Sequence, residues 1–84
     1  MFETDKNMIK VIDHLKDSGL IKYKTEAYEV MNLDTVRVYK IRFPEKFSRK
    51  QANHFSAEDI RLLCKHFNIN ANYIYGLEAN MFLK

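Results

Sequence analysis

The side chains most often used as metal ligands, or as catalytic nucleophile and base, are few in this chain: His14, His54, His66 and Cys64. Cys64 and His66 lie two residues apart in a stretch of helical periodicity, so they point to different sides of a helix. Cys64 falls on the apolar face of that stretch, which favours a buried structural thiol, and a single cysteine cannot form a disulfide within the chain. The two glycines, Gly19 and Gly76, do not form a phosphate-binding loop. We therefore expect no enzymatic activity, no cofactor and no metal site.

Basic side chains offer a different chemistry, the binding of anions, and they are concentrated in the middle of the chain. Residues 22–54 hold eight Lys and Arg against four acidic residues, a net charge of +4. Residues 1–21 carry a net charge of −1, and residues 55–84 carry none. An anionic partner, such as the phosphate backbone of a nucleic acid, would therefore be attracted to the middle segment.

The elements that position these charges are predicted to be helices. With 46% hydrophobic and 30% charged residues, but only two glycines and one proline, the chain has the composition of a globular all-α protein. Its 84 residues suffice for one compact core, so we expect a single domain over residues 1–84, with residues 77–84 as a C-terminal tail. No apolar run approaches the roughly 20 residues of a membrane span, and the polar, acidic start does not resemble a secretory signal. We therefore expect a cytoplasmic protein that does not enter a membrane.

Apolar residues at helical spacing predict a first helix over residues 6–18. Thr4 or Asp5 is available as its N-cap, and Gly19 stands just past its end, where a left-handed residue commonly ends a helix. Residues 20–21, Leu and Ile, are expected to pack back on this helix after the glycine.

Two short helices are predicted next, over residues 24–31 and 35–42. Asn32 is suited to a left-handed turn between them, and Asp34 is suited to cap the second. The run of β-branched and aromatic residues in 35–42 also allows a strand as the alternative. Pro44 ends this element, because the residue before a proline is pushed out of the helical conformation.

The remaining chain holds one long connection and two further helices. Residues 44–55 are polar and basic, without a clear period. Ser56 opens a capping-box pattern, and the apolar stripe that follows, which runs to Phe67, predicts the most regular helix of the chain. Asn70 is expected to cap a last short helix, which Gly76 ends.

The short helices on either side of Asn32 have the spacing of a helix-turn-helix, in which the first helix braces the second. Such a motif needs apolar residues on both sides of its turn, and five are present: Ala27, Met31, Leu33, Val38 and Ile41. The tight position between the two helices is filled either by Tyr28 or, in a register shifted by one, by Ala27.

Residues 7–76 resemble the Cro and phage-repressor (lambda repressor-like) type of helix-turn-helix domain, a five-helix bundle whose second and third helices form the motif. Residues 67–76, FNINANYIYG, are similar to the family's close of helix 4, turn and short aromatic helix. Three features differ from the family pattern: Asn32 replaces the usual glycine of the turn, Tyr28 replaces a small residue, and the 44–55 connection is longer. The resemblance implies sequence-specific binding of double-stranded DNA by a transcriptional regulator, such as a repressor that occupies an operator.

On this interpretation residues 35–42 form the recognition helix. Val38 and Ile41 point to the core, whereas Val36, Tyr39 and Lys40 point away from it and Thr35 lies on the flank. The residues expected to contact bases are Thr35, Val36, Tyr39 and Lys40. The cations expected to contact phosphate lie around this helix: Lys22, Lys24, Arg37, Arg42, Lys46, Arg49 and Lys50.

The same fold has a second possible use, as a protein-interaction module such as an antitoxin or an assembly factor. Val36, Tyr39 and Phe43 would then contact another protein instead of DNA. The dependence of binding on salt separates the two uses.

The tail contains three consecutive apolar residues, Met81, Phe82 and Leu83. They either fold back over the first and fifth helices, or meet the same segment of a second chain. We expect the homodimer, because a two-fold pair places two recognition helices one turn of DNA apart and raises affinity.

Overall fold

The computed structural model describes residues 2–46 and 53–83, and in these residues the chain is helical. The elements, in chain order, are α1 (Glu3–Asp17), α2 (Lys24–Val30), α3 (Thr35–Arg42), a 3₁₀ helix (Pro44–Lys46), α4 (Ala57–Phe67) and α5 (Ala71–Ile74). The described ranges contain no strand, and β-pairing there is limited to an isolated antiparallel bridge between Ile69 and Phe82. The expected all-α class with five α-helices is therefore confirmed, and residues 35–42 form a helix rather than a strand. No helix in these ranges is long and apolar enough to cross a membrane.

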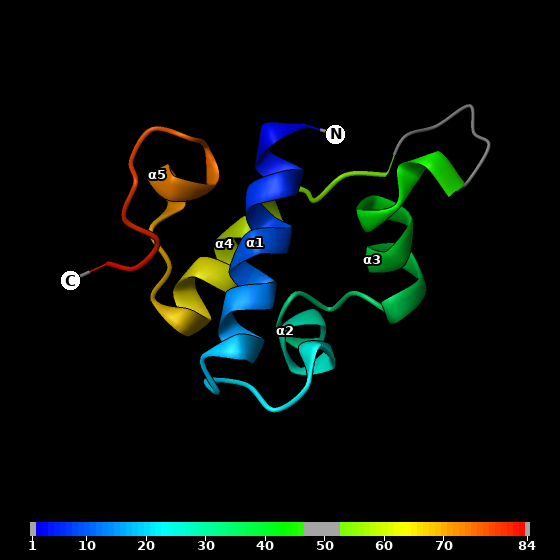
Figure 1. Ribbon diagram of the computed structural model, residues 1–84, viewed down its shortest axis with the longest axis horizontal. Coiled ribbons are helices and arrows are strands. Elements are labelled where there is room, and N and C mark those ends of the chain that lie inside the picture. The colour runs from blue at the N-terminus through cyan, green and yellow to red at the C-terminus, as the bar shows by residue number, and fades with distance from the viewer. Residues whose placement is uncertain (1, 47–52, 84) are drawn as a thin grey trace.

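Helix α1 is the central element of the fold (Figure 1). It packs against α2, α3 and α5, while α4 packs against α2 and α5. The apolar side chains of α1 that predicted the helix are completely buried: Met8, Val11, Ile12 and Leu15. They belong to one core cluster that also contains buried residues of every other α-helix, so a single core holds α2 and α3 on α1.

The start of α1 differs from the sequence-based prediction. The helix begins at Glu3 instead of residue 6, its N-cap is Phe2, and no side chain caps it. The prediction that Thr4 or Asp5 is the N-cap was wrong. The carboxyl group of Asp5 instead accepts a hydrogen bond from the backbone N–H of Phe55, at 2.9 Å, and lies 2.5 Å from Nδ1 of His54. The carboxyl group that was expected to cap its own helix is therefore buried, at 1% exposure, in contacts with residues distant in the sequence.

The end of α1 follows the prediction more closely. Gly19 has a φ of +83°, the left-handed conformation expected just past the helix. The backbone N–H of Ile21 donates to the carbonyl of Leu15 at 3.2 Å, and Ile21 is buried. Leu20 is 61% exposed, so of the two apolar residues after the glycine only Ile21 packs back on α1.

Local hydrogen bonds and one left-handed residue fix the start of α2, the turn after it and the start of α3. Glu26 reaches back from the first turn of α2, and its carboxylate accepts from the backbone N–H groups of Lys22 and Tyr23, at 2.5 and 2.8 Å. Asn32 takes the left-handed conformation with φ of +58°, as its residue type predicts. Asp34 caps α3 by accepting from the backbone N–H of Arg37 at 2.7 Å.

The second half of the fold follows its local signals. Ser56 and Asp59 form the expected capping box at the start of α4, with hydrogen bonds of 3.1 and 2.8 Å. Asn70 caps α5 by accepting from the backbone N–H of Asn72 at 3.1 Å. Asn7 of α1, which is 5% exposed, donates to the carbonyls of residues 73 and 74 at 3.3 and 3.0 Å and so ties the end of α5 to α1.

The tail folds back over its own chain, which is the first of the two arrangements that the sequence left open. The backbone N–H of Asn70 donates to the carbonyl of Met81 at 2.8 Å, and that of Leu83 donates to the carbonyl of Asn68 at 3.0 Å. Met81 and Phe82 pack against the core, and the Phe82 ring lies 5.6 Å from that of His14. Leu83 stays 51% exposed. The homodimer through this segment stays a prediction.

Candidate nucleic-acid interface

The outward face of α3 lies opposite the residues that hold this helix on the core. Val38 and Ile41 are each 1% exposed, as the helical spacing predicts. On the other side Val36 is 62% exposed, Tyr39 is 42% exposed, and Thr35 is exposed as well. Lys40 is half-buried. The four residues expected to contact bases therefore share the solvent-facing part of one short helix, at its amino end and middle.

An aromatic and cationic group extends this face past the end of α3. The rings of Tyr39 and Phe43 lie 4.9 Å apart, and the ammonium group of Lys46 stands 4.8 Å from the centre of the Phe43 ring. Lys46 Nζ also lies 3.4 Å from the Tyr39 hydroxyl. The sequence predicted Lys46 as a phosphate contact, and the structure places its charge beside the aromatic part of the α3 surface.

Two further predicted phosphate contacts lie at the edges of the α2–α3 segment. Lys22 is exposed just before α2, with its Nζ 5.7 Å from the centre of the Tyr23 ring. Arg37 is exposed on α3, and its guanidinium donates to the backbone carbonyl of His54 at 3.3 Å. Arg37 thereby joins α3 to the segment that the buried Asp5 anchors on α1. Arg49 and Lys50, two others of the predicted set, lie outside the described residues.

Lys24 and Arg42 meet at one carboxylate, that of Asp13 on α1. Arg42 donates two hydrogen bonds to Asp13, at 2.7 and 3.3 Å, and the Nζ of Lys24 lies 3.0 Å from Oδ1 of the same group. The three side chains are 21%, 39% and 37% exposed for Arg42, Lys24 and Asp13. One acidic residue therefore connects α1 with both α2 and α3.

The electrostatics of this cluster follow from its geometry. Partial burial alone would raise the pKa of Asp13, but the hydrogen bonds and charges of Arg42 and Lys24 outweigh burial and hold the pKa below its usual value. The hydrogen bond with Asp13 raises the pKa of Arg42, and Tyr28 beside it adds to the increase. Asp13 and Arg42 are therefore both charged over the physiological pH range.

Sequence reasoning did not predict the contacts that Asp13, Asp5 and His54 make in the fold. The packing of α1 is explained by its apolar stripe, to which Asp13 does not belong. The partners of Asp13 lie 11 and 29 residues further along the chain. Asp5 and His54 are 49 residues apart. No local pattern in the sequence indicates such contacts, whereas the helical spacing of Val38 and Ile41 predicted the two faces of α3 directly.

The structure also describes the tight position between α2 and α3. Ala27 is completely buried and Tyr28 is 8% exposed, so both candidate residues lie inside the fold. The carbonyl of Tyr28 accepts from the backbone N–H of Leu33 at 2.9 Å, which closes the turn after α2. The Tyr28 side chain is therefore buried in the fold, beside Arg42, together with Ala27.

Other potentially reactive groups lie away from α3. Cys64 is half-buried on α4, and burial raises the pKa of its thiol above the ordinary value. Within residues 2–46 and 53–83, no group of three or more His, Cys, Asp or Glu side chains is placed to hold a metal ion. In comparisons with protein-family models, curated proteins and solved structures, no match to this chain was found.

Proposed function

We propose that this chain is a sequence-specific binder of double-stranded DNA and a transcriptional regulator, with α2 and α3 as a helix-turn-helix of the Cro and phage-repressor type. The observation that carries the proposal is the division of α3 into two faces. Val38 and Ile41 fix the helix from inside, while Thr35, Val36 and Tyr39 are exposed on a helix that begins after a tight turn. A short helix held from one side, with mixed apolar and polar groups on the other, suits insertion into the major groove.

The charges around α3 support the same function. The segment from residue 22 to residue 54 carries a net charge of +4, and Lys22, Arg37 and Lys46 are exposed on or beside the two helices. Phosphates flank a helix that lies in the major groove, so cations at its edges would contact them. In this proposal Thr35, Val36, Tyr39 and Lys40 read base edges, and the surrounding cations fix the register on the duplex.

The test is a titration of a fluorescently labelled duplex with the full chain, repeated at several salt concentrations. DNA binding predicts that log K falls linearly with log salt, with about 0.9 of slope for each phosphate contacted. Replacing Lys40 or Arg37 with alanine is expected to weaken binding, whereas the melting midpoint changes little, because surface substitutions shift stability by about 0.5 kcal/mol or less.

Lys65 provides the matched control. It is exposed on α4, a helix that lies on the other side of α1 from α3 (Figure 1). Lys65→Ala removes the same charge and is expected to leave both the affinity and the salt slope unchanged. If Lys40→Ala and Arg37→Ala also bind as tightly as the unaltered chain, α3 does not contact DNA. A chain that binds no duplex even at low salt contradicts the whole proposal.

A second function is favoured by one specific observation, the apolar character of the same face. Val36 is 62% exposed on α3, and the rings of Tyr39 on the same helix and Phe43 just past its end lie 4.9 Å apart. Such a surface also suits a protein partner. Binding through this face to a protein would show no steep linear dependence on log salt, so the same titration separates the two functions.

A homodimer is part of the proposal for DNA binding, because two linked half-site contacts raise affinity over one. Leu83, at 51% exposure, is the tail residue of the predicted seam that remains open to a second copy, since Met81 and Phe82 pack on their own chain. Sedimentation of the free chain and of its DNA complex at high micromolar concentration measures this directly. A monomer in both states contradicts the dimer.

A further inference from the structure

The Asp13 cluster contains two of the five predicted phosphate contacts that lie in the described residues. Lys24 is the first residue of α2, and Arg42 is the last residue of α3. Both turn to a carboxylate on α1 that is only 37% exposed. An arginine that donates two hydrogen bonds to one carboxylate forms one of the stronger ion pairs in proteins, and a partly buried pair is screened less by salt than an exposed one.

We infer that Asp13 is a positioning residue that withholds Lys24 and Arg42 from DNA phosphate and so limits sequence-independent binding. The inference rests on the proposed DNA-binding function, and it revises the expectation that these two cations contact phosphate directly. Phosphate would have to displace a bidentate partner from Arg42, whose side chain is 21% exposed. Exposed Lys22, Arg37 and Lys46 carry no such ion pair with a carboxylate in the described part of the chain.

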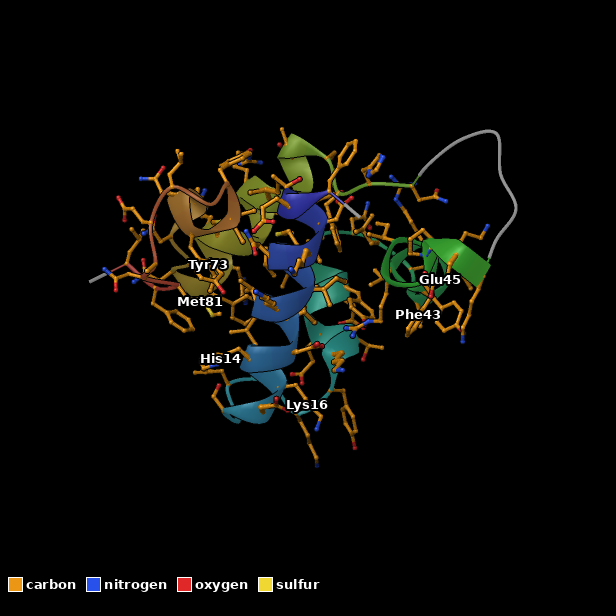
Figure 2. All side chains as sticks on the ribbon, turned by 45° about the horizontal axis from the view of Figure 1, so that its top comes forward. His14, Lys16, Phe43, Glu45, Tyr73 and Met81 are labelled. Carbon is orange, nitrogen blue, oxygen red and sulfur yellow. The ribbon has the colours of Figure 1, made fainter. Side chains whose placement is uncertain are left out.

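Asp13 also connects the two helices of the proposed helix-turn-helix to α1. Its carboxylate holds the first turn of α2 and the last turn of α3 against α1. The ion pairs with α1 therefore help to fix the distance between α2 and α3. In Figure 2 Phe43 and Glu45, which follow α3, lie at one end of the molecule, and His14 of α1 lies across the body of the fold from them. The two hydrogen bonds of Arg42 to Asp13 show that its side chain extends from α3 to α1.

The experiment compares Asp13→Asn with the unaltered chain in titrations of a scrambled duplex across salt concentrations. Release of one or both cations predicts tighter binding at low salt and a slope of log K against log salt that is steeper by about 0.9 for each cation released. A merely structural role for Asp13 predicts the opposite, weaker binding without a steeper slope. An unchanged or shallower slope for Asp13→Asn overturns the inference.

Asp17→Asn is the matched control, because it removes the same charge from an exposed position on the same helix. It is expected to leave the slope unchanged; an equal steepening in Asp17→Asn would assign the effect to net charge and overturn the inference.

A second variant keeps the inference testable if Asp13→Asn folds poorly. Arg42→Gln, made in a chain that keeps Asp13, is expected to leave the slope of log K against log salt unchanged, since Arg42 is held by Asp13. A slope shallower by about 0.9 would show that Arg42 already contacts phosphate, and would overturn the inference. Failure of the unaltered chain to bind any duplex is a different result, which contradicts the proposed function itself.

Discussion

Replacing Asp5 with alanine is expected to lower the free energy of unfolding by about 2 to 4 kcal/mol. The side chain is 1% exposed, and its Oδ1 accepts the backbone N–H of Phe55 at 2.9 Å. A buried donor left without its acceptor costs about 1 to 3 kcal/mol. The contact of Oδ2 with His54, whose side chain is 35% exposed, adds about 1 kcal/mol, because water can replace part of it.

Urea unfolding followed by circular dichroism measures this loss, with an unchanged dependence on denaturant as the check that the same surface unfolds. Asp5→Asn keeps an oxygen for the N–H of Phe55, so its cost is expected to be clearly smaller than that of alanine. Asp17→Ala, an exposed aspartate on the same helix, is the matched control and is expected to change stability by about 0.5 kcal/mol or less.

Two results would refute this reasoning. If Asp5→Ala costs no more than Asp17→Ala, the buried carboxyl group does not anchor residues 54–55 on α1. If Asp5→Asn costs as much as Asp5→Ala, the loss does not come from the hydrogen bond to Phe55.

Three further predictions concern the core, the Asp13 cluster and the tail. Ile41→Ala should lower the free energy of unfolding by about 2 to 5 kcal/mol, because Ile41 is 1% exposed and its loss leaves a cavity. Val36→Ala should change the free energy of unfolding by about 0.5 kcal/mol or less. Similar losses for the two variants in urea unfolding would contradict the assignment of the two faces of α3. Because the pKa of Asp13 is lowered from 3.8 in the folded protein, its ion pairs stabilise the fold above pH 3.8, and this stability is lost as the pH falls through 3.8 toward the folded pKa. Since 37% of the side chain is exposed, the contribution is at most about 1 kcal/mol, and Asp13→Asn should flatten that part of the curve of stability against pH. Deleting residues 80–84 removes the backbone pairing with the turn before α5 and should lower the melting midpoint; an unchanged midpoint with a smaller mass in solution would place the tail in a dimer seam instead.

Most element boundaries could be predicted because they depend on neighbours in the sequence. Asp34, Ser56 and Asn70 cap the helices that they precede, and Asn32 takes the left-handed turn, since each of these effects acts over two or three residues. The two faces of α3 follow from helical periodicity in the same way. The side chain that caps the start of α2 was not predicted. It is Glu26, which lies inside the helix and reaches back to the preceding backbone N–H groups.

The contacts that join distant segments could not be predicted. Asp5 has the residue type of an N-cap and directly precedes the predicted helix start at residue 6, yet it lies inside α1 and its carboxyl group accepts from a backbone N–H 50 residues later. Leu20 is as apolar as Ile21, but only Ile21 faces the core, which depends on the path of the chain after Gly19. The ion pairs of Asp13 depend on how α1, α2 and α3 meet in space, and that arrangement is set by the whole core.

The hydrogen bonds of Asn7 to the end of α5 have a consequence for the order in which the chain acquires its structure during synthesis. The donor and the carbonyl of Ile74 are 67 residues apart, and at about 5 to 20 residues per second the ribosome needs roughly 3 to 13 seconds to make the intervening chain. During that time α1 has no α5 to pack against, and its buried apolar side chains stay without part of their partners. Because closing so long a loop is slow compared with forming local helices, α5 and the tail are expected to dock last, and a nascent chain that stops before residue 71 should remain sensitive to proteases.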